Sequence, residues 1–195
     1  MKVLTRVILG VVYALVISLP VTSVFSGDDN RLTNADFEEG NIGGWAMWAV
    51  TGGISLDENH TRRGICSANP SLNVDGGPFE CGGLIQEFED FDVGDTVYTS
   101  VWIKTDDLRG PGVSKVYAIL KLEFWDGDSM IIAYESDRVT KTADWKKVSV
   151  QSVVPEDTTK VKCVLILWND SSTGSLGNVY FDDAYMGTSP EQSVI

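Results

Sequence analysis

The feature of the sequence that most constrains its fold is a strict alternation of side chains in two long segments. In residues 115–126, KVYAILKLEFWD, every second side chain from Val116 to Phe124 is apolar. The positions between them include an aromatic and polar set: Tyr117, Lys121, Glu123 and Trp125. Because successive side chains of a β-strand point to opposite faces, this pattern predicts a strand with one face in a core and the other partly wet.

Residues 160–168, KVKCVLILW, repeat the pattern. One face is apolar and consists of Val161, Cys163, Leu165 and Leu167. The opposite face carries Lys162, Val164, Ile166 and Trp168. Two strands of this kind predict a packed core together with a second surface, on which a tryptophan lies beside polar groups.

Turn-rich stretches such as EEGNIGG, DVGD, DGDS and PEDTT separate further candidate strands after Gly27. The predicted strands are residues 31–38, 45–50, 54–58, 71–74, 82–89, 96–105, 115–126, 130–137, 145–154, 160–168 and 178–186. Beyond the N-terminal segment, no window has a sustained helical period. This spacing predicts an all-β fold, a two-sheet β-sandwich of the jelly-roll type.

The N-terminal segment has the features of a signal peptide. Lys2 and Arg6 precede an apolar run over residues 7–19, and Val24 and Ser26 match a small-residue cleavage site. The run is shorter than the roughly 20 residues that a helix needs to cross a bilayer. We therefore expect a cleaved signal, with an uncleaved anchor as the alternative.

These boundaries define the expected domain organisation. The signal peptide covers residues 1–26, one domain covers residues 27–188, and a short tail follows over residues 189–195. The expected location is secreted or extracytoplasmic, with no membrane association after cleavage.

The chain is strongly acidic, with a net charge of −13. Residues 1–26 carry two basic and no acidic residues, so their removal brings the charge to −15. Such a balance argues against nucleic acid and anionic membrane surfaces as partners. It is compatible with bound cations, and solubility alone accounts for it equally well.

Three cysteines occur in the sequence. Cys66 and Cys81 bracket the segment CSANPSLNVDGGPFEC, whereas Cys163 lies within an apolar strand. In an oxidising compartment we expect a disulfide between Cys66 and Cys81 and a buried free thiol at Cys163.

Several short motifs recur in a characteristic order along the chain. The stretch LTNADFEEGNIGGW contains Asn34, Phe37, Glu38, Gly40, Gly43, Gly44 and Trp45. The later motifs are Tyr98-x-Ser100-x-Trp102-x-Lys104, then Trp145, and finally Phe181-Asp182-Asp183. Together they resemble carbohydrate-binding modules of the family 4, 9 and 22 type (cellulase-C-like), which are galactose-binding-like jelly rolls. The resemblance covers about residues 30–187.

This resemblance implies a structural calcium ion between the first and last strands. Glu38 and Asp182 would be its side-chain ligands, completed by the backbone oxygen of Asp36 and by carbonyls between residues 58 and 65, in keeping with the oxygen ligands that calcium prefers. The segment HTRRGICSANPSLNV departs from the usual family pattern, so the loop ligands stay open. The alternative is that Asp182 accepts backbone hydrogen bonds or pairs with Arg31 without metal. In either case successive side chains of a strand point to opposite faces, so we expect Asp182 to point inward and Asp183 to face outward.

The resemblance also implies binding of a neutral polysaccharide or oligosaccharide through aromatic stacking. Trp45, Trp102 and Trp145 match structural positions of the family and are expected in the core. The remaining aromatic and polar candidates for the ligand site are Trp48, Trp125, Trp168, Tyr117, Tyr134, Glu123, Lys121 and Asn169.

No catalytic residue is expected. Glycoside hydrolysis needs two carboxylates across a cleft, and although Glu123 and Glu135 lie on neighbouring predicted strands, nothing around either one marks a proton donor. Modules of this type are commonly attached to glycoside hydrolases, so a separate hydrolase is an expected partner. An adhesion or protein-interaction role is the other alternative, which a broad apolar patch without polar groups would favour.

Overall fold

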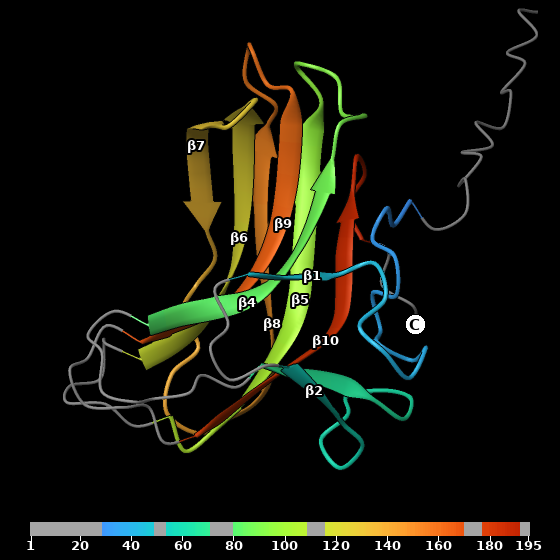
Figure 1. Ribbon diagram of the computed structural model, residues 1–195, viewed down its shortest axis with the longest axis vertical. Helices are drawn as coiled ribbons and strands as arrows, with labels where there is room; N and C mark the ends of the chain where they lie inside the picture. Colours follow the sequence, from blue (N-terminus) through green and yellow to red (C-terminus); the bar gives the residue numbers. More distant parts are fainter. Residues whose placement is uncertain (1–28, 49–53, 71–79, 109–115, 170–176, 192–195) are drawn as a thin grey trace, which may run out of the picture.

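The computed structural model describes residues 29–48, 54–70, 80–108, 116–169 and 177–191. These residues form ten strands in two five-stranded antiparallel sheets and no helix. Sheet A has the order β1 (Ala46–Trp48), β4 (Glu80–Phe88), β9 (Lys160–Asn169), β6 (Val116–Asp126) and β7 (Ser129–Glu135). Sheet B has the order β2 (Ile54–Asp57), β3 (Ser67–Pro70), β10 (Asn178–Gly187), β5 (Thr96–Asp106) and β8 (Ala143–Val153). The predicted all-β, two-sheet jelly roll is confirmed (Figure 1).

The core lies between the two sheets, and strands β6 and β9 contribute to it as their alternation predicts. Leu120, Leu122 and Leu165 are fully buried in this core. The opposite face of the same strands forms a separate, smaller apolar cluster around Ile119 and Ile166. The outer face of sheet A is therefore partly apolar, as expected from its sequence.

The first predicted strand, residues 31–38, is instead a series of turns. Asn34 and Phe37 have positive φ angles of 46° and 58°, which a regular strand does not allow. The Asn34 side chain stabilises these turns, because it donates to the carbonyl of Asn41 at 2.7 Å and accepts from the amide of Glu39 at 3.3 Å. Strand β3 was not predicted, and the predicted strand over residues 71–74 lies outside the described residues.

This turned N-terminal segment connects the two sheets along one side of the sandwich (Figure 1). On the side of sheet B, Arg31 donates its amide to Met186 of β10 at 2.8 Å, and Ala184 donates to Ala35 at 2.8 Å. On the side of sheet A, the Gln86 side chain exchanges two hydrogen bonds with the backbone of Thr33, at 2.7 and 3.0 Å.

Only one of the three tryptophans expected in the core lies there. Trp45 is 5% exposed, its ring stacks on Phe37 at 5.6 Å, and its Nε1–H donates to the carbonyl of Asn34. Trp102 and Trp145 are half-buried and do not belong to the core. Trp102 lies on the outer face of sheet B, where it is paired in register with Asp182.

The expected disulfide between Cys66 and Cys81 is wrong, since both residues are free thiols. Cys66 precedes β3 of sheet B, whereas Cys81 lies on β4 of sheet A and packs on that sheet's outer cluster. The two residues thus belong to different sheets, although the sequence places them at either end of one loop. Cys163 is a buried free thiol as predicted, and burial raises its pKa to about 12.

The described C-terminal residues fold back onto sheet B. The carboxylate of Asp29 accepts hydrogen bonds from the backbone amides of Thr188 and Ser189, at 2.7 and 2.9 Å, and from both of their hydroxyl groups. Burial opposes the charge of Asp29, but the hydrogen bonds from Ser189 and Thr188 outweigh it and hold its pKa below the ordinary value.

The expected signal peptide, residues 1–26, lies outside the described residues. Within the part of the chain that the structure describes, no helix is long and apolar enough to cross a membrane.

Replacement of Trp45 by alanine should lower the free energy of unfolding by about 3–5 kcal/mol, because the truncation leaves a cavity beside Phe37. Trp48→Ala is the matched control, since its side chain is 39% exposed and should change stability by about 0.5 kcal/mol or less. Urea unfolding followed by fluorescence measures both. Equal effects of the two substitutions would contradict the core assignment.

Asp29→Asn should destabilise the protein at neutral pH by on the order of 1 kcal/mol, through weaker hydrogen bonds to Thr188 and Ser189. Because the folded-state pKa of Asp29 is lowered, this stabilisation exists above the carboxyl's ordinary pKa of 3.8 and is lost as the pH falls through the lower folded value. The wild type and the variant should therefore converge in acid. A stability difference that does not depend on pH would argue against a role for the charge.

Candidate functional site

The outer face of sheet A carries a groove of about 340 Å³. It crosses the whole sheet, with lining side chains from β1, β4, β9, β6 and β7. Its aromatic and charged lining consists of Trp48, Glu87, Lys121, Glu123, Trp125 and Lys162. Lys162 is the direct cross-strand partner of both Glu87 and Glu123, which places all three on one face.

The charged groups of this groove are paired with one another. Glu87 forms ion pairs with Lys162 at 2.7 Å and with Lys160 at 3.2 Å. The hydrogen bond from Lys162 is the main reason that the pKa of Glu87 lies below its ordinary value. Glu123 pairs with Lys121 at 2.9 Å and accepts the indole N–H of Trp125 at 2.9 Å. The groove is thus polar but nearly balanced in charge.

Two tryptophans border the groove. Trp125 is half-buried, and the ammonium of Lys162 lies 4.1 Å from the centre of its ring. The indole N–H of Trp125 is held by Glu123, which fixes the orientation of the ring. Trp48 is 39% exposed on the edge strand β1. The sheet therefore presents aromatic surface at two points of a groove that is otherwise lined with hydrogen-bonding groups.

The structure brings together four of the predicted ligand residues, namely Trp48, Trp125, Lys121 and Glu123. Trp168 lies on the same face, but it stacks on Tyr117 at 6.3 Å outside the groove lining. Tyr117 itself is only 6% exposed, and the guanidinium of Arg138 lies 4.0 Å from its ring centre.

Two predicted ligand residues lie on the wrong side of sheet A. Tyr134 is paired with the core residue Leu122, so it leans toward the core side, where it contacts Phe124 edge-on at 6.3 Å. Asn169 follows Leu167 on the core-facing side of β9 and is fully buried.

Sequence reasoning missed six residues that line the groove, namely Met47, Ile85, Glu87, Met130, Lys162 and Val164. Glu87 alternates with Gln86, whose side chain is turned inward to Thr33, so the period-two pattern of β4 contained its position. Met130 faces Trp125 only because a register shift intervenes between β6 and β7. No sequence signal predicts that irregularity.

A second site of interest lies where β10 meets residues 57–66. Asp182 is fully buried, and its carboxylate accepts the amide of Arg62 at 2.8 Å and that of Asp183 at 2.7 Å. Burial is the main cause that raises the pKa of Asp182 to about 6, and the Asp183 carboxylate adds to it. The predicted burial of one carboxylate of this pair is confirmed, but Asp182 is buried on the outer face of sheet B, in register with Trp102, and not in the core between the sheets.

Glu38 binds the same segment, residues 57–66, near its C-terminal end. Its carboxylate accepts the amides of Ile65 at 2.8 Å and Cys66 at 2.9 Å. Gly64 has a φ angle of 70°, and a Cβ there would overlap the Glu38 carboxylate. Glycine is needed at this position for both reasons. The side chain of Asp36 accepts the amide of Glu38 at 3.3 Å.

The arginines near this region form ion pairs with carboxylates other than those of Asp182 and Glu38. Arg62 pairs with Asp183, and its guanidinium lies 3.8 Å from the ring centre of Trp102. Asp183 is therefore half-buried and paired rather than simply outward-facing. Arg31, the alternative partner expected for Asp182, pairs instead with Asp90 at 2.9 Å.

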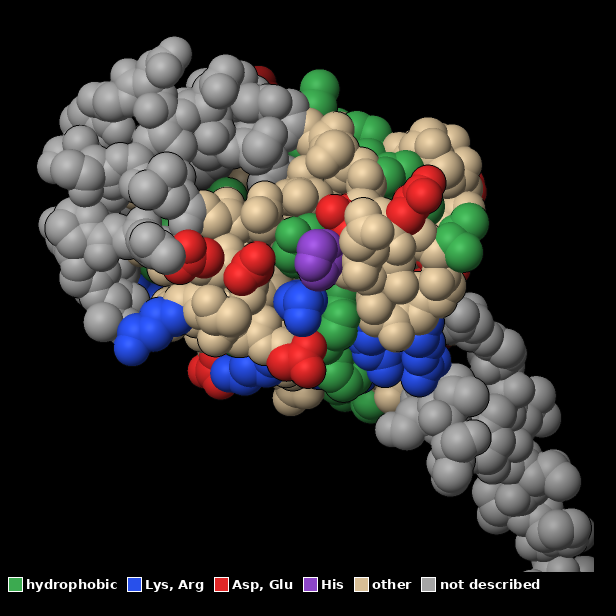
Figure 2. Space-filling model, turned by 90° about the horizontal axis from the view of Figure 1, so that it is seen from below, with side chains coloured by type: hydrophobic (Ala, Val, Ile, Leu, Met, Phe, Trp, Pro, Cys, Tyr) green, Lys and Arg blue, Asp and Glu red, His purple; other side chains and the backbone are tan. Residues whose placement is uncertain are grey.

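The surface of this region carries the histidine of the chain, with acidic and basic side chains beside it (Figure 2). His60 stacks on Tyr180 at 4.4 Å, and its Nδ1 lies 3.0 Å from the Asp57 carboxylate. These contacts hold the start of the segment that both carboxylates bind.

Calcium prefers oxygen ligands, and this region contains the carboxylates of Glu38 and Asp182. Burial raises the pKa of the Cys66 thiol, and the charges of Glu38, Glu58 and Asp182 raise it further. Among the described residues, no three side chains of His, Cys, Asp or Glu are arranged to hold a metal ion by themselves. A calcium ion here would therefore need backbone carbonyl oxygens in addition to the carboxylates.

No protein-family model and no curated protein sequence matches the chain. Solved structures do resemble it. TmCBM61, solved in complex with β-1,4-galactotriose, has a TM-score of 0.56 and 17% identity over 82% of this chain and 99% of that one. The CBM22-2 xylan-binding domain of Paenibacillus barcinonensis Xyn10C has a TM-score of 0.54 and 20% identity, over 80% and 98% of the two chains.

The enzymatically active domain of tailspike protein 4 from bacteriophage CBA120 has a TM-score of 0.61 at 13% identity over 82% of this chain. The match spans only 21% of that protein. At these identities the likeness is one of fold, and the chain has the two-sheet jelly-roll fold of carbohydrate-binding modules.

Proposed function

We propose that this protein is a non-catalytic carbohydrate-binding module whose groove on sheet A binds a neutral polysaccharide or oligosaccharide. The observation that carries the proposal is the groove itself, in which tryptophans lie beside a set of mutually paired charges on the non-core face of a sheet. Aromatic faces can stack on the apolar faces of sugar rings, while the charged side chains form hydrogen bonds with hydroxyl groups.

The electrostatics of the groove favour an uncharged ligand. Glu87 and Glu123 are each paired with lysine, so no unpaired cation among these groups attracts an acidic sugar. The net charge of −13 repels anionic polymers as well. The similar modules named above, which are associated with galactotriose and with xylan, support neutral β-linked glycans as the first candidates.

The non-catalytic assignment rests on the surroundings of Glu123. Its carboxylate is held by Lys121 and by the indole of Trp125, so it is engaged as a structural group of the groove. Glu135 is the cross-strand partner of Lys121 on the edge strand β7. The signal-like N-terminal sequence supports a location outside the cytoplasm, where a separate glycoside hydrolase would be a partner. An adhesion role is the second candidate, which the exposed Met130, Ile131 and Ile132 of β7 favour.

Trp125→Ala should weaken binding to soluble xylan or β-1,4-galactan by about 1 kcal/mol or more, roughly fivefold in the dissociation constant. Trp48→Ala should act in the same direction. The matched control is Trp168→Ala, because Trp168 is half-buried on the same face but lies outside the groove. Isothermal titration calorimetry with each polysaccharide measures the effect.

Two outcomes would contradict this function. One is unchanged binding in both Trp125→Ala and Trp48→Ala while the proteins stay folded. The other is release of reducing sugar by the purified wild-type protein, which would make it an enzyme.

We also propose that Glu38 and Asp182 bind a structural calcium ion together with carbonyl oxygens of residues 58–65. A buried carboxylate without a cation is costly, and Asp182 is fully buried beside a second acidic residue. A bound calcium ion would compensate this charge and tie the segment to β10 and to the N-terminal turns.

If calcium binds here, chelation should lower the melting temperature, because a ligand of the folded state is removed. Glu38→Gln and Asp182→Asn should each abolish the difference between calcium and chelator. Asp183→Asn is the control and should keep it, since Asp183 is occupied by Arg62. A wild-type melting temperature that is indifferent to chelator, with no metal found by elemental analysis, would rule the site out.

A further inference from the structure

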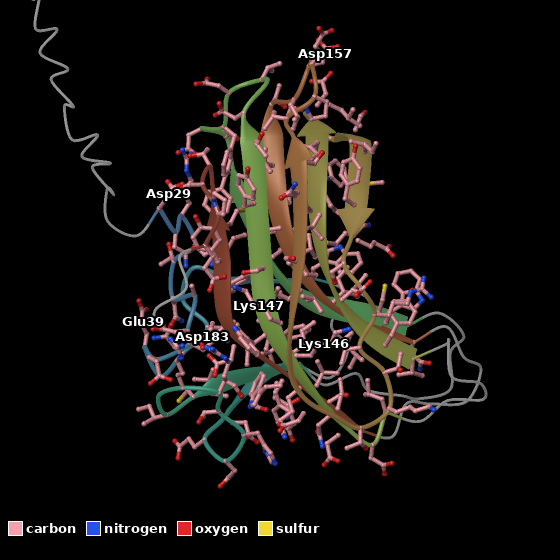
Figure 3. All side chains as sticks on the ribbon, turned by 180° about the vertical axis from the view of Figure 1, so that it is seen from behind. Asp29, Glu39, Lys146, Lys147, Asp157 and Asp183 are labelled. Carbon is pink, nitrogen blue, oxygen red and sulfur yellow. The ribbon has the colours of Figure 1, made fainter. Side chains whose placement is uncertain are left out.

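A second cavity, of about 470 Å³, lies on the outer face of sheet B. It is on the opposite side of the sandwich from the groove, and Figure 3 looks onto this side, with Lys147 lying over β5 and β8. Its volume is within the range of about 300–1,000 Å³ typical of small-molecule sites. No residue of the cavity belongs to the groove or to residues 57–66, the segment that Asp182 and Glu38 bind.

The floor of this cavity is built by direct cross-strand partners. Tyr98 of β5 is paired with Gln151 of β8, and Ser100 of β5 is paired with Ser149 of β8 and with Tyr185 of β10. Directly paired residues point to the same face of a sheet, so these five side chains share one surface. The accessible part of that surface is the ring of Tyr98, the hydroxyl of Ser149 and the amide of Gln151, whereas Tyr185 and Ser100 are only 5% and 4% exposed and form its buried base.

The wall of the cavity is the C-terminal turn. Asp29 holds Thr188 and Ser189 through four hydrogen bonds, and the Tyr185 hydroxyl donates to the carbonyl of Ser189. This clamp brings Glu191 over the sheet. Specific hydrogen bonds therefore hold the wall of the cavity in place.

The charged groups at the cavity neutralise each other. Glu191 pairs with Lys147 at 2.7 Å and accepts the hydroxyl of Ser100. Among the described residues, the side chains of Tyr98, Ser149 and Gln151 form no hydrogen bond with another protein group. The cavity therefore has no net charge from this pair, and it offers hydrogen-bond donors and acceptors to a ligand.

We propose that this cavity is a second carbohydrate-binding site, which takes one or two residues of a neutral sugar. An apolar ligand would strip water from Lys147, Glu191 and Gln151 without replacing their hydrogen bonds, which is unfavourable. An anion would not be attracted, because the charge of Lys147 is already neutralised by Glu191. Sugar hydroxyl groups both donate and accept, so they match an ammonium, a carboxylate, an amide and a hydroxyl at once, while the ring of Tyr98 can face the apolar side of the sugar.

The cavity and the groove lie on different sheets, so the two sites could be occupied at the same time. Because the two sheets of a sandwich are separated by a core about 10 Å thick, a sugar in the cavity and a glycan in the groove lie on opposite faces. One module could then hold two separate chains or two branches of one glycan. The inference stands whether or not the groove binds polysaccharide.

The test is a two-dimensional ¹H–¹⁵N NMR titration of the protein with the methyl β-glycosides of galactose, xylose and glucose. At least one of them should cause saturable shifts of the amide signals of Ser100, Ser149 and Gln151. Gln151→Ala and Tyr98→Ala should each weaken this binding by about fivefold or more. The matched control is Val153→Ala. Val153 is exposed and lies on β8, the strand of Gln151, but it does not line the cavity.

Trp125→Ala should leave these shifts unchanged, since the groove lies on the other sheet. The inference is overturned if none of the three glycosides causes saturable shifts at the cavity. It is also overturned if the shifts persist in both cavity variants, or if Trp125→Ala removes them. Failure of the groove variants to affect polysaccharide binding would contradict the proposed function and leave this result untouched.

Discussion

The antiparallel pairing of β6 with β9 at the centre of sheet A is the constraint on which the rest of the structure depends. The odd-numbered residues of β9 and the even-numbered residues of β6 fill the core, so their neighbours must point outward. Ile119 and Ile166 form an apolar cluster there, and Lys162 and Trp125 continue the same face into the groove. One backbone arrangement therefore builds both the core and the groove, and a register slip would destroy them together.

Carboxylates that bind backbone amides hold the irregular segments that lie against sheet B. Asp182 and Glu38 hold residues 62–66, and Asp29 holds the C-terminal turn. The three carboxylates organise irregular segments that carry no strand hydrogen bonds of their own. This use of acidic residues gives part of the chain's negative charge a structural purpose, in addition to solubility.

The outer faces of the two sheets share one chemical character. Each combines aromatic rings with a lysine–glutamate pair, through Lys162 and Glu87 on sheet A and through Lys147 and Glu191 on sheet B. Paired charges offer hydrogen bonds without attracting ions. This shared character underlies both proposed sugar sites, although their residues come from unrelated parts of the sequence.

The sequence by itself determined the fold class, the faces of β6 and β9 and half of the groove, because period-two alternation is a local property of a strand. It also predicted a buried carboxylate in the Asp182-Asp183 pair, although residues far away in the chain, and not the core, cover Asp182. It could not determine which strand lies at an edge, which segment lies in which sheet or where the register shifts. Tyr134 and Asn169 were therefore misplaced as ligand residues, and Cys66 was paired with Cys81. Only the tertiary structure decided these points, because they depend on contacts between residues far apart in the chain.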